Sequence, residues 1–392
     1  MPVSIIEVPI CRTNLGVDQL ISSISCNNSV SGTGSGQIEL TGHRDDPALW
    51  MDSYDYVQRV EIDFSVNGGA TWSRRFTGLI SEVGESFSVG SKEKALSISL
   101  SGTTRLLEVS RVVLNPSLFG LDIDCSSKSA IEEIEKTLIN KLSLMTANEI
   151  VEYAYAQMCC PISPKPQLFA GGSSAVVNPL TFRNILLYIS EAKTSMQIIQ
   201  EVCKMVNCWF FSDENGDFHF TGIGGSDIMG GEYFSPERVR SYNFKKSEKG
   251  LVTMGIGKAV LSVSGVAFDL NIKDAYGVTG GCGGGDDGGG ALCTRAMNFG
   301  QNYALAKAEN VDELSETAEE YAAGQMDLVN ANEYTGSISV VNVQDSHIGR
   351  GMGITGGGRG VVVGESFNWT PTSNGSSTFT LGYGCPPYGD LP

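Results

Sequence analysis

The sequence predicts an α+β chain that is mainly β, with a first β-domain, an inserted αβ module and a second β-domain carrying one long helix. Three observations support this class: several segments alternate apolar and polar residues, 48 glycines supply turns, and a few segments show helical spacing. The chain has 392 residues, enough for about two to four domains. Apolar residues make up 41% and charged residues 18%, which is typical of a folded chain and not of a disordered one.

We place the first β-domain at residues 1–145. Its clearest predicted strand is Val57 to Val66, where Val60, Ile62, Phe64 and Val66 alternate with polar residues. Asn67-Gly68 predicts a tight hairpin turn into SRRFTGLISEV, and ALSISLSG predicts a third strand. Three meandering strands with one apolar face indicate a small barrel or sandwich. Residues 111–145 are interpreted as a loop and helix excursion.

We place the αβ insert module at residues 146–235. Thr146 with Glu149 three residues later predicts a capping box at the start of a helix. A second helix is expected from Thr194 or Ser195, because apolar residues recur at helical spacing through TSMQIIQEVCKMVNC. The following WFFSDENGDFHFTG predicts a hairpin with its turn at Asp213 to Gly216.

We place the second β-domain at residues 236–392. It is expected to contain a mobile glycine-rich loop at 277–292 and a long helix at 302–326. Strands are expected in YTGSISVVNV, GRGVVVGESFNW and SSTFTLGYG. Both β-domains use alternating strands joined by glycine-rich turns, but the sequences themselves do not demonstrate a repeat.

No catalytic residue is predicted. Nucleophilic hydrolysis needs a base beside the nucleophile, most often histidine, and no G-x-S-x-G motif encloses a serine. Glycosidase chemistry needs two facing carboxylates, whereas neighbouring residues on a helix or strand point in different directions. The candidates weighed for these two roles are His43, His219 and His347, and the acidic pairs Asp45-Asp46, Glu132-Glu133 and Glu319-Glu320.

No metal-binding or cofactor-binding residue is predicted either. Asp213, Asn215 and Asp217 resemble the start of a calcium loop, but the glycine is misplaced and no glutamate follows at the twelfth position. The glycine-rich loop lacks the Lys-Ser or Lys-Thr of a phosphate-binding loop. The ten cysteines contain no C-x-x-C spacing and are expected to be reduced thiols rather than zinc ligands.

The net charge of −17 argues against nucleic-acid binding, which depends on lysine and arginine contacts to phosphates. It is compatible with a nucleic acid passing an acidic wall without sticking to it. No apolar run is long enough for a membrane span, and the N-terminal MPVSIIEVPI lacks the features of a secretory signal.

Three segments, in this order, resemble the hub proteins of phage baseplates. This family includes the contractile-phage and Mu-type hubs, the late control protein D group and the N-terminal region of VgrG proteins. The segments are RRFTGLISEV with ALSISLSGTTRLL, then TSMQIIQEVCKMVNCWFFSDENGDFHFTG, then the long helix followed by GSISVVNV. Each motif is degenerate, and the resemblance depends on their order.

The resemblance implies two tail-tube-like β-barrels in one chain, separated by inserted modules. It further implies a homotrimeric ring that adapts a sixfold tail tube to a threefold spike and lines a DNA channel. The expected partners are other copies of the chain, the tail tube protein, the spike, and neighbouring baseplate or tape-measure proteins. DNA would pass without specific binding. The expected location is the virion tail baseplate, assembled in the host cytoplasm, with contacts made through sheet edges and apolar patches.

Three alternatives remain open on sequence alone. The chain could be another tail component, such as a distal-tail ring or a fibre-hub protein. It could be a cell-wall hydrolase, which would require facing carboxylates or a metal-bound histidine. It could also be a sugar-binding tail module with an exposed aromatic platform, although three of the four tryptophans lie in predicted strands, where packing in a core is more common. The tryptophans are Trp50, Trp72, Trp209 and Trp369.

Overall fold

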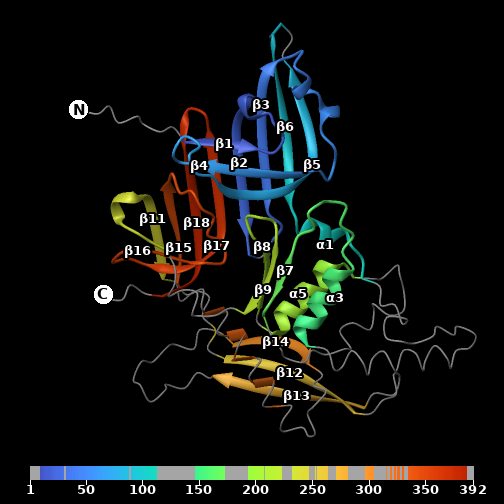
Figure 1. The fold of residues 1–392 in the computed structure, drawn as a ribbon. Coiled ribbons are helices and arrows are strands. Elements are labelled where there is room, and N and C mark those ends of the chain that lie inside the picture. The colour runs from blue at the N-terminus through green and yellow to red at the C-terminus, as the bar shows by residue number, and fades with distance from the viewer. Residues whose placement is uncertain are drawn as a thin grey trace, which may run out of the picture.

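A computed structural model gives the fold (Figure 1). The structure describes most of residues 9–112, 146–172, 193–222 and 232–246, together with 252, 254–263, 271–280 and 296–303. It also describes scattered positions between 315 and 330, and residues 334–385. Inside these ranges, residues 31, 88–89 and 207 are not described. The predicted excursion therefore lies almost entirely outside the described residues.

One large sheet runs through both ends of the chain, which makes the described chain mainly β as predicted. Its strands follow the order β1-β4-β5-β6-β3-β2-β17-β18-β15-β11, and β16 and β10 extend it beside β17. The first group of strands is β1 (Ile10–Thr13), β2 (Ile21–Ser29), β3 (Ser35–His43), β4 (Arg59–Ser65), β5 (Ser73–Phe87) and β6 (Glu93–Gly102). The second group is β10 (Glu232–Phe234), β11 (Val239–Lys246), β15 (Tyr334–Val341), β16 (Gly351–Ile354), β17 (Arg359–Thr370) and β18 (Ser373–Cys385).

The two groups repeat one topology. The first unit pairs its strands in the order β4-β5-β6-β3-β2, and the second pairs β16-β17-β18-β15-β11 in the same way. Every one of these pairings is antiparallel. We call these groups the first and second repeat units. The two sequences did not demonstrate this repeat, although the family resemblance implied two similar units.

The repeat extends to the register of individual residues. Gly36 and Ile38 of β3 correspond to Gly336 and Ile338 of β15, since each pair faces its neighbouring strands in the same way. Both units also carry β-bulges at matching places. The matching register shifts are Ile21/Ser23 with Val239/Ser241, and Ile80/Glu82 with Val362/Gly364. Because bulges are positioned features of a sheet, their recurrence shows that the two units are built alike.

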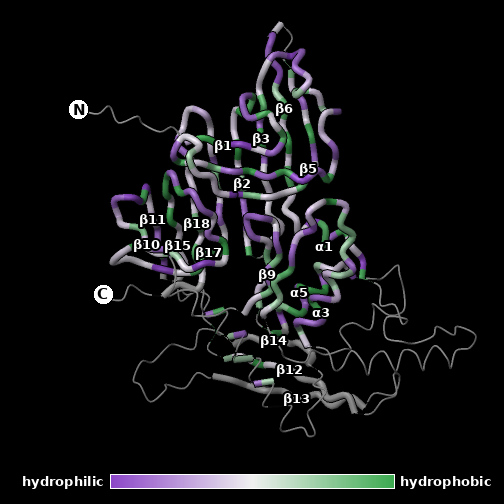
Figure 2. Tube along the Cα trace, viewed as in Figure 1, coloured by the Kyte–Doolittle hydropathy of each residue, from purple (hydrophilic) through white to green (hydrophobic). Residues whose placement is uncertain are grey.

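Hydrophobic and hydrophilic residues alternate along the strands of the first unit (Figure 2). Val60, Ile62 and Phe64 of β4 are fully buried, as the alternation in the sequence predicted. The core of this unit also contains Phe367 and Trp369, which come from β17 of the second unit. The two units therefore share apolar packing as well as the hydrogen bonds between β2 and β17.

Two details of the first unit correct the sequence prediction. The predicted strand begins at Arg59 and not at Val57, because Val57 has a φ of 66°, which no extended strand allows. The turn after β4 is a longer loop and not a two-residue hairpin turn. Its backbone is held by the Asn67 side chain, whose Oδ1 accepts the Thr71 N–H at 2.9 Å. Asp and Asn side chains commonly stabilise loops in this way.

The middle of the chain contains helices packed on a small sheet, with the order β7-β9-β8. Thr146 and Glu149 form the predicted capping box at the start of α3. Thr194 and Gln197 exchange the equivalent hydrogen bonds at the start of α5. The elements are α1 (Arg105–Val109), α3 (Ala147–Ala156), β7 (Leu168–Ala170), α5 (Ser195–Val206), β8 (Cys208–Ser212) and β9 (Phe218–Gly222).

A third sheet, β13-β12-β14, corrects two predicted boundaries in the second half of the chain. β14 (Ala296–Tyr303) continues past residue 302, so the predicted helix begins later, and the described residues from 315 to 330 are helical. β13 (Asn271–Gly280) extends into the predicted glycine-rich loop, and 281–292 lies outside the described residues. β12 spans Met254–Val263. Short 3-10 helices lie at Asp18–Leu20, Pro47–Leu49, Met51–Ser53 and Pro236–Arg238.

The predicted domain limits at 145/146 and 235/236 remain predictions. β10 precedes the second limit and pairs with β16 of the second repeat unit. The strand path of the large sheet is open among the described residues, so closure of either unit into a barrel also remains a prediction.

Candidate functional site

The candidate site is the junction where the two repeat units and the αβ module meet. On the polar face of β1, β4 and β5, oppositely charged side chains alternate in a row that we call the charge ladder. Asp63 accepts hydrogen bonds from Arg12 at 3.1 Å and from Arg74 at 2.5 Å. Glu61 in turn pairs with Arg74 at 2.6 Å and with Arg59 at 3.0 Å. The alternation that predicted a half-buried strand thus also places these charges in one row.

Arg74 lies at the centre of this ladder. Burial by itself lowers the pKa of its guanidinium, but the hydrogen bonds and charges of Asp63 and Glu61 outweigh burial and raise the pKa. The cation is therefore held firmly in its charged form. Pairs of this kind in a network stabilise a surface more than isolated surface ion pairs do.

Arg59 connects the ladder to the αβ module. Its two terminal nitrogens donate to the carbonyl of Pro164 at 3.0 Å and to the carbonyl of Asn215 at 3.2 Å. Thr77 of β5 donates to the carbonyl of Glu214 at 2.8 Å, and Thr103 donates to that of Gly216 at 2.7 Å. The hairpin turn between β8 and β9 is thereby docked onto the first repeat unit.

The docked turn is the segment that resembles a calcium loop in sequence. Asp213 Oδ1 accepts the backbone N–H groups of Asn215 and Asp217, each at 2.9 Å. Its second oxygen lies 3.1 Å from His219 Nε2. Burial raises the pKa of Asp213, but the His219 hydrogen bond and the two backbone donors outweigh it, so the pKa is lowered. The carboxylate organises the hairpin, as expected for a polar turn.

Gly216 allows the close approach of this turn. It has a φ of 82°, and a Cβ atom there would lie 2.7 Å from Thr103 Cγ2. Next to it, Glu214 faces Arg350 of the second unit at 3.6 Å. Burial raises the pKa of Glu214 above its ordinary value, with Asp213 and Glu365 adding to the effect and Arg350 opposing it. The turn therefore contacts both repeat units.

Arg75 links the two repeat units through contacts in the protein interior. Its side chain is fully buried and pairs with the buried Glu365 of β17. It also donates to Ser377 Oγ at 2.9 Å and to the carbonyl of Asp345, and its guanidinium lies 4.7 Å from the Phe367 ring centroid. Sequence reasoning assigned no role to Arg75, because residues 75–80 are buried without alternation.

Glu365 is bound by more than Arg75. Its second oxygen accepts a hydrogen bond from Ser346 Oγ at 2.7 Å and from the backbone N–H of His347 at 3.1 Å. A buried carboxylate needs such partners because desolvation of an unpaired charge is costly. The pair and its donors thus fix the position of one repeat unit against the other.

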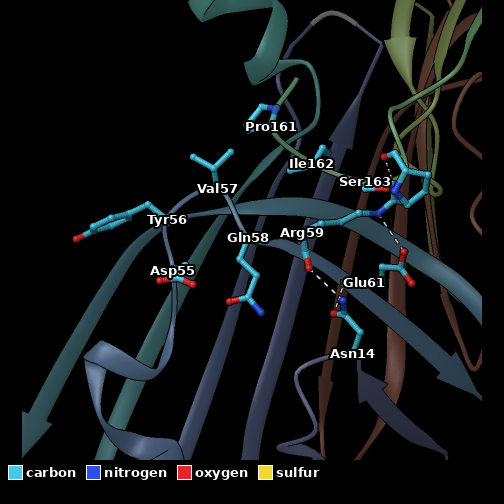
Figure 3. A pocket seen from close by; sticks show the side chains of 11 residues that line it. Asn14, Asp55, Tyr56, Val57, Gln58, Arg59, Glu61, Pro161, Ile162 and Ser163 are labelled. Carbon is cyan, nitrogen blue, oxygen red and sulfur yellow. Dashed lines mark hydrogen bonds and ion pairs between the residues drawn. The ribbon is translucent and has the colours of Figure 1, made fainter. Parts of the chain in front are cut away.

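An open pocket of about 490 Å³ lies beside the charge ladder (Figure 3). Its walls come from the loop before β4 and from residues 161–164 of the αβ module. Glu61, one of its two carboxylates, is engaged by Arg59 and Arg74. Figure 3 shows the Arg59 side chain extending toward the 161–164 segment, while Tyr56 points away from it. Glycoside hydrolysis requires two facing carboxylates, and of the two in this pocket Glu61 is held by two arginines.

The histidines considered in the sequence lie in three separate settings. His43 is exposed, with Nδ1 3.6 Å from Asp45. His219 is stacked between the rings of Phe169 and Phe211, at centroid distances of 5.0 and 5.3 Å. His347 is buried and hydrogen-bonded to Glu232 at 2.5 Å.

The structure describes three of the six residues in the acidic pairs. Asp46 accepts the Ala48 N–H at 2.9 Å and so caps a short helix, while Asp45 is exposed. Glu319 is exposed, and Glu132, Glu133 and Glu320 lie outside the described residues. Among the described residues, no three histidine, cysteine or acidic side chains are grouped as metal ligands would be.

The six cysteines whose side chains the structure describes are free thiols. Burial raises the pKa of Cys26 to about 12, with a smaller opposing effect of Arg75, and burial likewise raises the pKa of Cys208 to about 11. Burial thus favours the protonated form of both thiols. None of the helices in the described part of the chain combines the length and apolarity that crossing a bilayer requires.

The four tryptophans do not share a surface role. Trp369 is buried, and its Nε1 donates to the Pro9 carbonyl at 3.2 Å. Trp209 is partly buried against the core of the second unit, and the guanidinium of Arg12 lies 4.2 Å from the Trp72 ring. Trp50 is 52% exposed, so it is the tryptophan that departs most from core packing.

Comparison with solved structures identifies the fold. The 43 kDa tail protein of prophage MuSo2 from Shewanella oneidensis matches with a TM-score of 0.55 at 13% identity, over 96% of this chain and 98% of that one. The tail protein from Neisseria meningitidis MC58 matches with a TM-score of 0.56 at 12% identity, over 96% of each chain. No family model matches the sequence, and no curated protein matches it.

The chain therefore has the fold of phage tail proteins along nearly its whole length. The resemblance to the hub family that the three ordered segments indicated is confirmed at the level of the fold. At these identities the similarity establishes the architecture alone.

Proposed function

We propose that this protein is a structural subunit of a phage tail, acting as a baseplate hub and not as an enzyme. The observation that carries the proposal is the repeat of one five-strand topology within a single chain, joined through β2 and β17. Each unit is proposed to be a tube-like barrel, with the αβ module inserted between them. Three chains would then supply six similar units, which matches a sixfold tail tube on one side and a threefold spike on the other.

The contacts at the junction support a structural role of this kind. The two units are fixed to each other by the buried Arg75–Glu365 pair and by Phe367 and Trp369 in a shared core. The turn at 213–217 attaches the αβ module to both units. A subunit that adapts two symmetries must keep its parts at a fixed angle, and this set of contacts does so.

The proposed partners are other copies of this chain, the tail tube protein, the spike and neighbouring baseplate or tape-measure proteins. The proposed location is the tail baseplate of the virion, after assembly in the host cytoplasm. The net charge of −17 suits a channel through which DNA passes without binding, because like charges keep the polymer from adhering.

Copy number tests the proposal. We expect light scattering of the purified protein, or symmetry analysis of purified tails by electron microscopy, to give three copies in a ring. Six copies would indicate a distal-tail ring instead. Clearing of peptidoglycan in a gel assay, lost on substitution of a single acidic residue such as Asp55→Asn, would favour a cell-wall hydrolase.

A further inference from the structure

The joint between the repeat units within one chain suggests how two chains join. β2 of the first unit pairs antiparallel with β17 of the second over six residue pairs, from Ser29 opposite Gly364 to Ile24 opposite Trp369. The last of these pairs is almost completely closed to solvent, since Ile24 is 1% exposed and Trp369 is 5% exposed.

Because the units repeat, each strand of this joint has an equivalent in the other unit. The matching bulges make β11 the equivalent of β2 and place Tyr242 at the position of Ile24. In the same way, β5 is the equivalent of β17. Glu82, the first residue after its bulge, corresponds to Gly364, and Phe87 corresponds to Trp369.

Both equivalent strands have an unpaired edge within the described part of the chain. β11 pairs with β15 alone and ends the large sheet. β5 pairs with β4 as far as Leu79, and from Glu82 to Phe87 it pairs with β6 alone. Such edges present backbone N–H and C=O groups to any strand of matching shape.

We propose that β11 of one copy pairs antiparallel with Glu82–Phe87 of β5 in a second copy, repeating between chains the joint that β2 and β17 make within one. This inference rests on the proposed ring-forming function and names the interface of the ring. The register between β2 and β17 within one chain predicts the register between β11 and β5 of two chains. Its predicted pairs are Phe87 opposite Tyr242, Ser86 opposite Asn243, and Glu85 opposite Phe244.

The side chains at these edges fit the pairing. Phe87 is 47% exposed and Tyr242 is 59% exposed, and the pairing would cover both aromatic rings as it covers their equivalents Trp369 and Ile24. Glu82 and Lys245 are both exposed and become diagonal neighbours across the new strand pair, with opposite charges. The interface is head-to-tail, so the same contact can repeat around a ring until it closes.

Disulfide trapping tests the register. Residues opposite each other in an antiparallel pair have Cα atoms about 4.5–5.5 Å apart, which a disulfide can span. We expect Ser86→Cys protein mixed with Asn243→Cys protein to form a cross-linked two-chain species under mild oxidation. The control is Ser86→Cys mixed with Arg240→Cys, which lies about 10 Å farther along the strand at about 3.3 Å per residue. Each single variant alone measures linkage through the native cysteines.

Substitution tests the same contact without cross-linking. Phe87→Glu and Tyr242→Glu should each weaken association at least tenfold in sedimentation experiments while leaving the circular dichroism spectrum and melting temperature near those of the native protein. Val109→Glu is the control, because Val109 is 56% exposed and lies in α1, away from both strand edges.

The outcomes separate this inference from the proposed function. A trimer that neither cross-links at Ser86 and Asn243 nor responds to the two substitutions overturns the strand pairing and leaves the ring intact. A native protein that stays monomeric at every concentration, and is present as one copy per purified tail, overturns both the strand pairing and the proposed hub function. Selective cross-linking together with weaker association supports the pairing.

Discussion

Arg75 and Glu365 form an ion pair in the interior, where each charge is stabilised by the other. Replacing Arg75 by methionine leaves Glu365 buried without its cation, which costs about 3–5 kcal/mol of folding free energy in comparable cases. We expect Arg75→Met to lower the denaturant midpoint strongly, and the double variant Arg75→Met/Glu365→Gln to recover part of the loss. Equal stability of native and single-variant proteins in urea titrations would contradict this account of the junction.

Glycine is required at position 216 for two reasons: its φ is positive, and a Cβ atom there would be too close to Thr103. We expect Gly216→Ala to destabilise the protein by more than the roughly 1–2 kcal/mol that a left-handed conformation alone costs an L-residue. Gly68→Ala is the control for φ alone, since Gly68 has a φ of 64° but nothing within 4 Å of its Cβ position. Thermal melts of the two variants measure the difference, and equal shifts would exclude the steric contribution of Thr103.

Glu214 gives stability a pH dependence, because burial raises its pKa in the folded protein. The folded state therefore holds its proton at pH values where the unfolded chain has released it. The stability that this proton contributes is fully present below the unfolded pKa near 4.5. It is lost as pH rises through the higher folded pKa. We expect Glu214→Gln to raise the melting temperature at pH 7 relative to the native protein. The difference should shrink on acidification toward pH 4, and a difference independent of pH would refute this origin.

At the scale of elements, helix caps and turns were predictable from neighbouring residues. We expect Thr146→Ala to destabilise α3 by about 1 kcal/mol, because its Oγ1 accepts the Glu149 N–H and the two residues form a capping box. Glu152→Ala, at an exposed position of the same helix, should have little effect. Hydrogen exchange of α3 amides compares the two, and similar protection in both variants would count against the cap.

Element boundaries were less predictable where tertiary contacts decide them. Val57 was predicted to begin the strand, yet its φ of 66° places it in the loop that frames the pocket. Residues 277–280 read as a flexible glycine-rich loop, but they pair with Met254–Gly257 of β12. Glycines of this kind carry no local signal for a strand, since only the partner strand supplies their hydrogen bonds.

At the scale of the molecule, the shared core couples the two repeat units. Phe367 of β17 packs in the core of the first unit, with its ring centroid 5.1 Å from that of Phe64. We expect Phe367→Ala to lower hydrogen-exchange protection in both units together, with a loss of about 3–5 kcal/mol. Val202→Ala in α5 should instead reduce protection mainly in the αβ module. Loss confined to β17 after Phe367→Ala would show that the units unfold separately.

The candidate site shows a similar division between local and long-range information. The polar turn at 213–217 could be predicted because Asp213, Asn215 and Gly216 are residues that favour turns through their own local chemistry. Its docking against Thr77 and Thr103 could not, because those partners lie more than a hundred residues away in the sequence. Arg75 was missed for the same reason, since its partner Glu365 lies in the other repeat unit.

By itself, the sequence determined the mainly β class, the capped helices of the αβ module, the half-buried strands and the resemblance to phage hub proteins. These follow from alternation, spacing and capping, which act over a few residues. The tertiary structure alone decided that the two halves repeat one register and share a core through β2 and β17. It also decided that, among the described residues, β11 and part of β5 each have an unpaired edge. Strand pairing joins residues hundreds of positions apart, so its energy is set by packing and hydrogen bonds that no local pattern encodes.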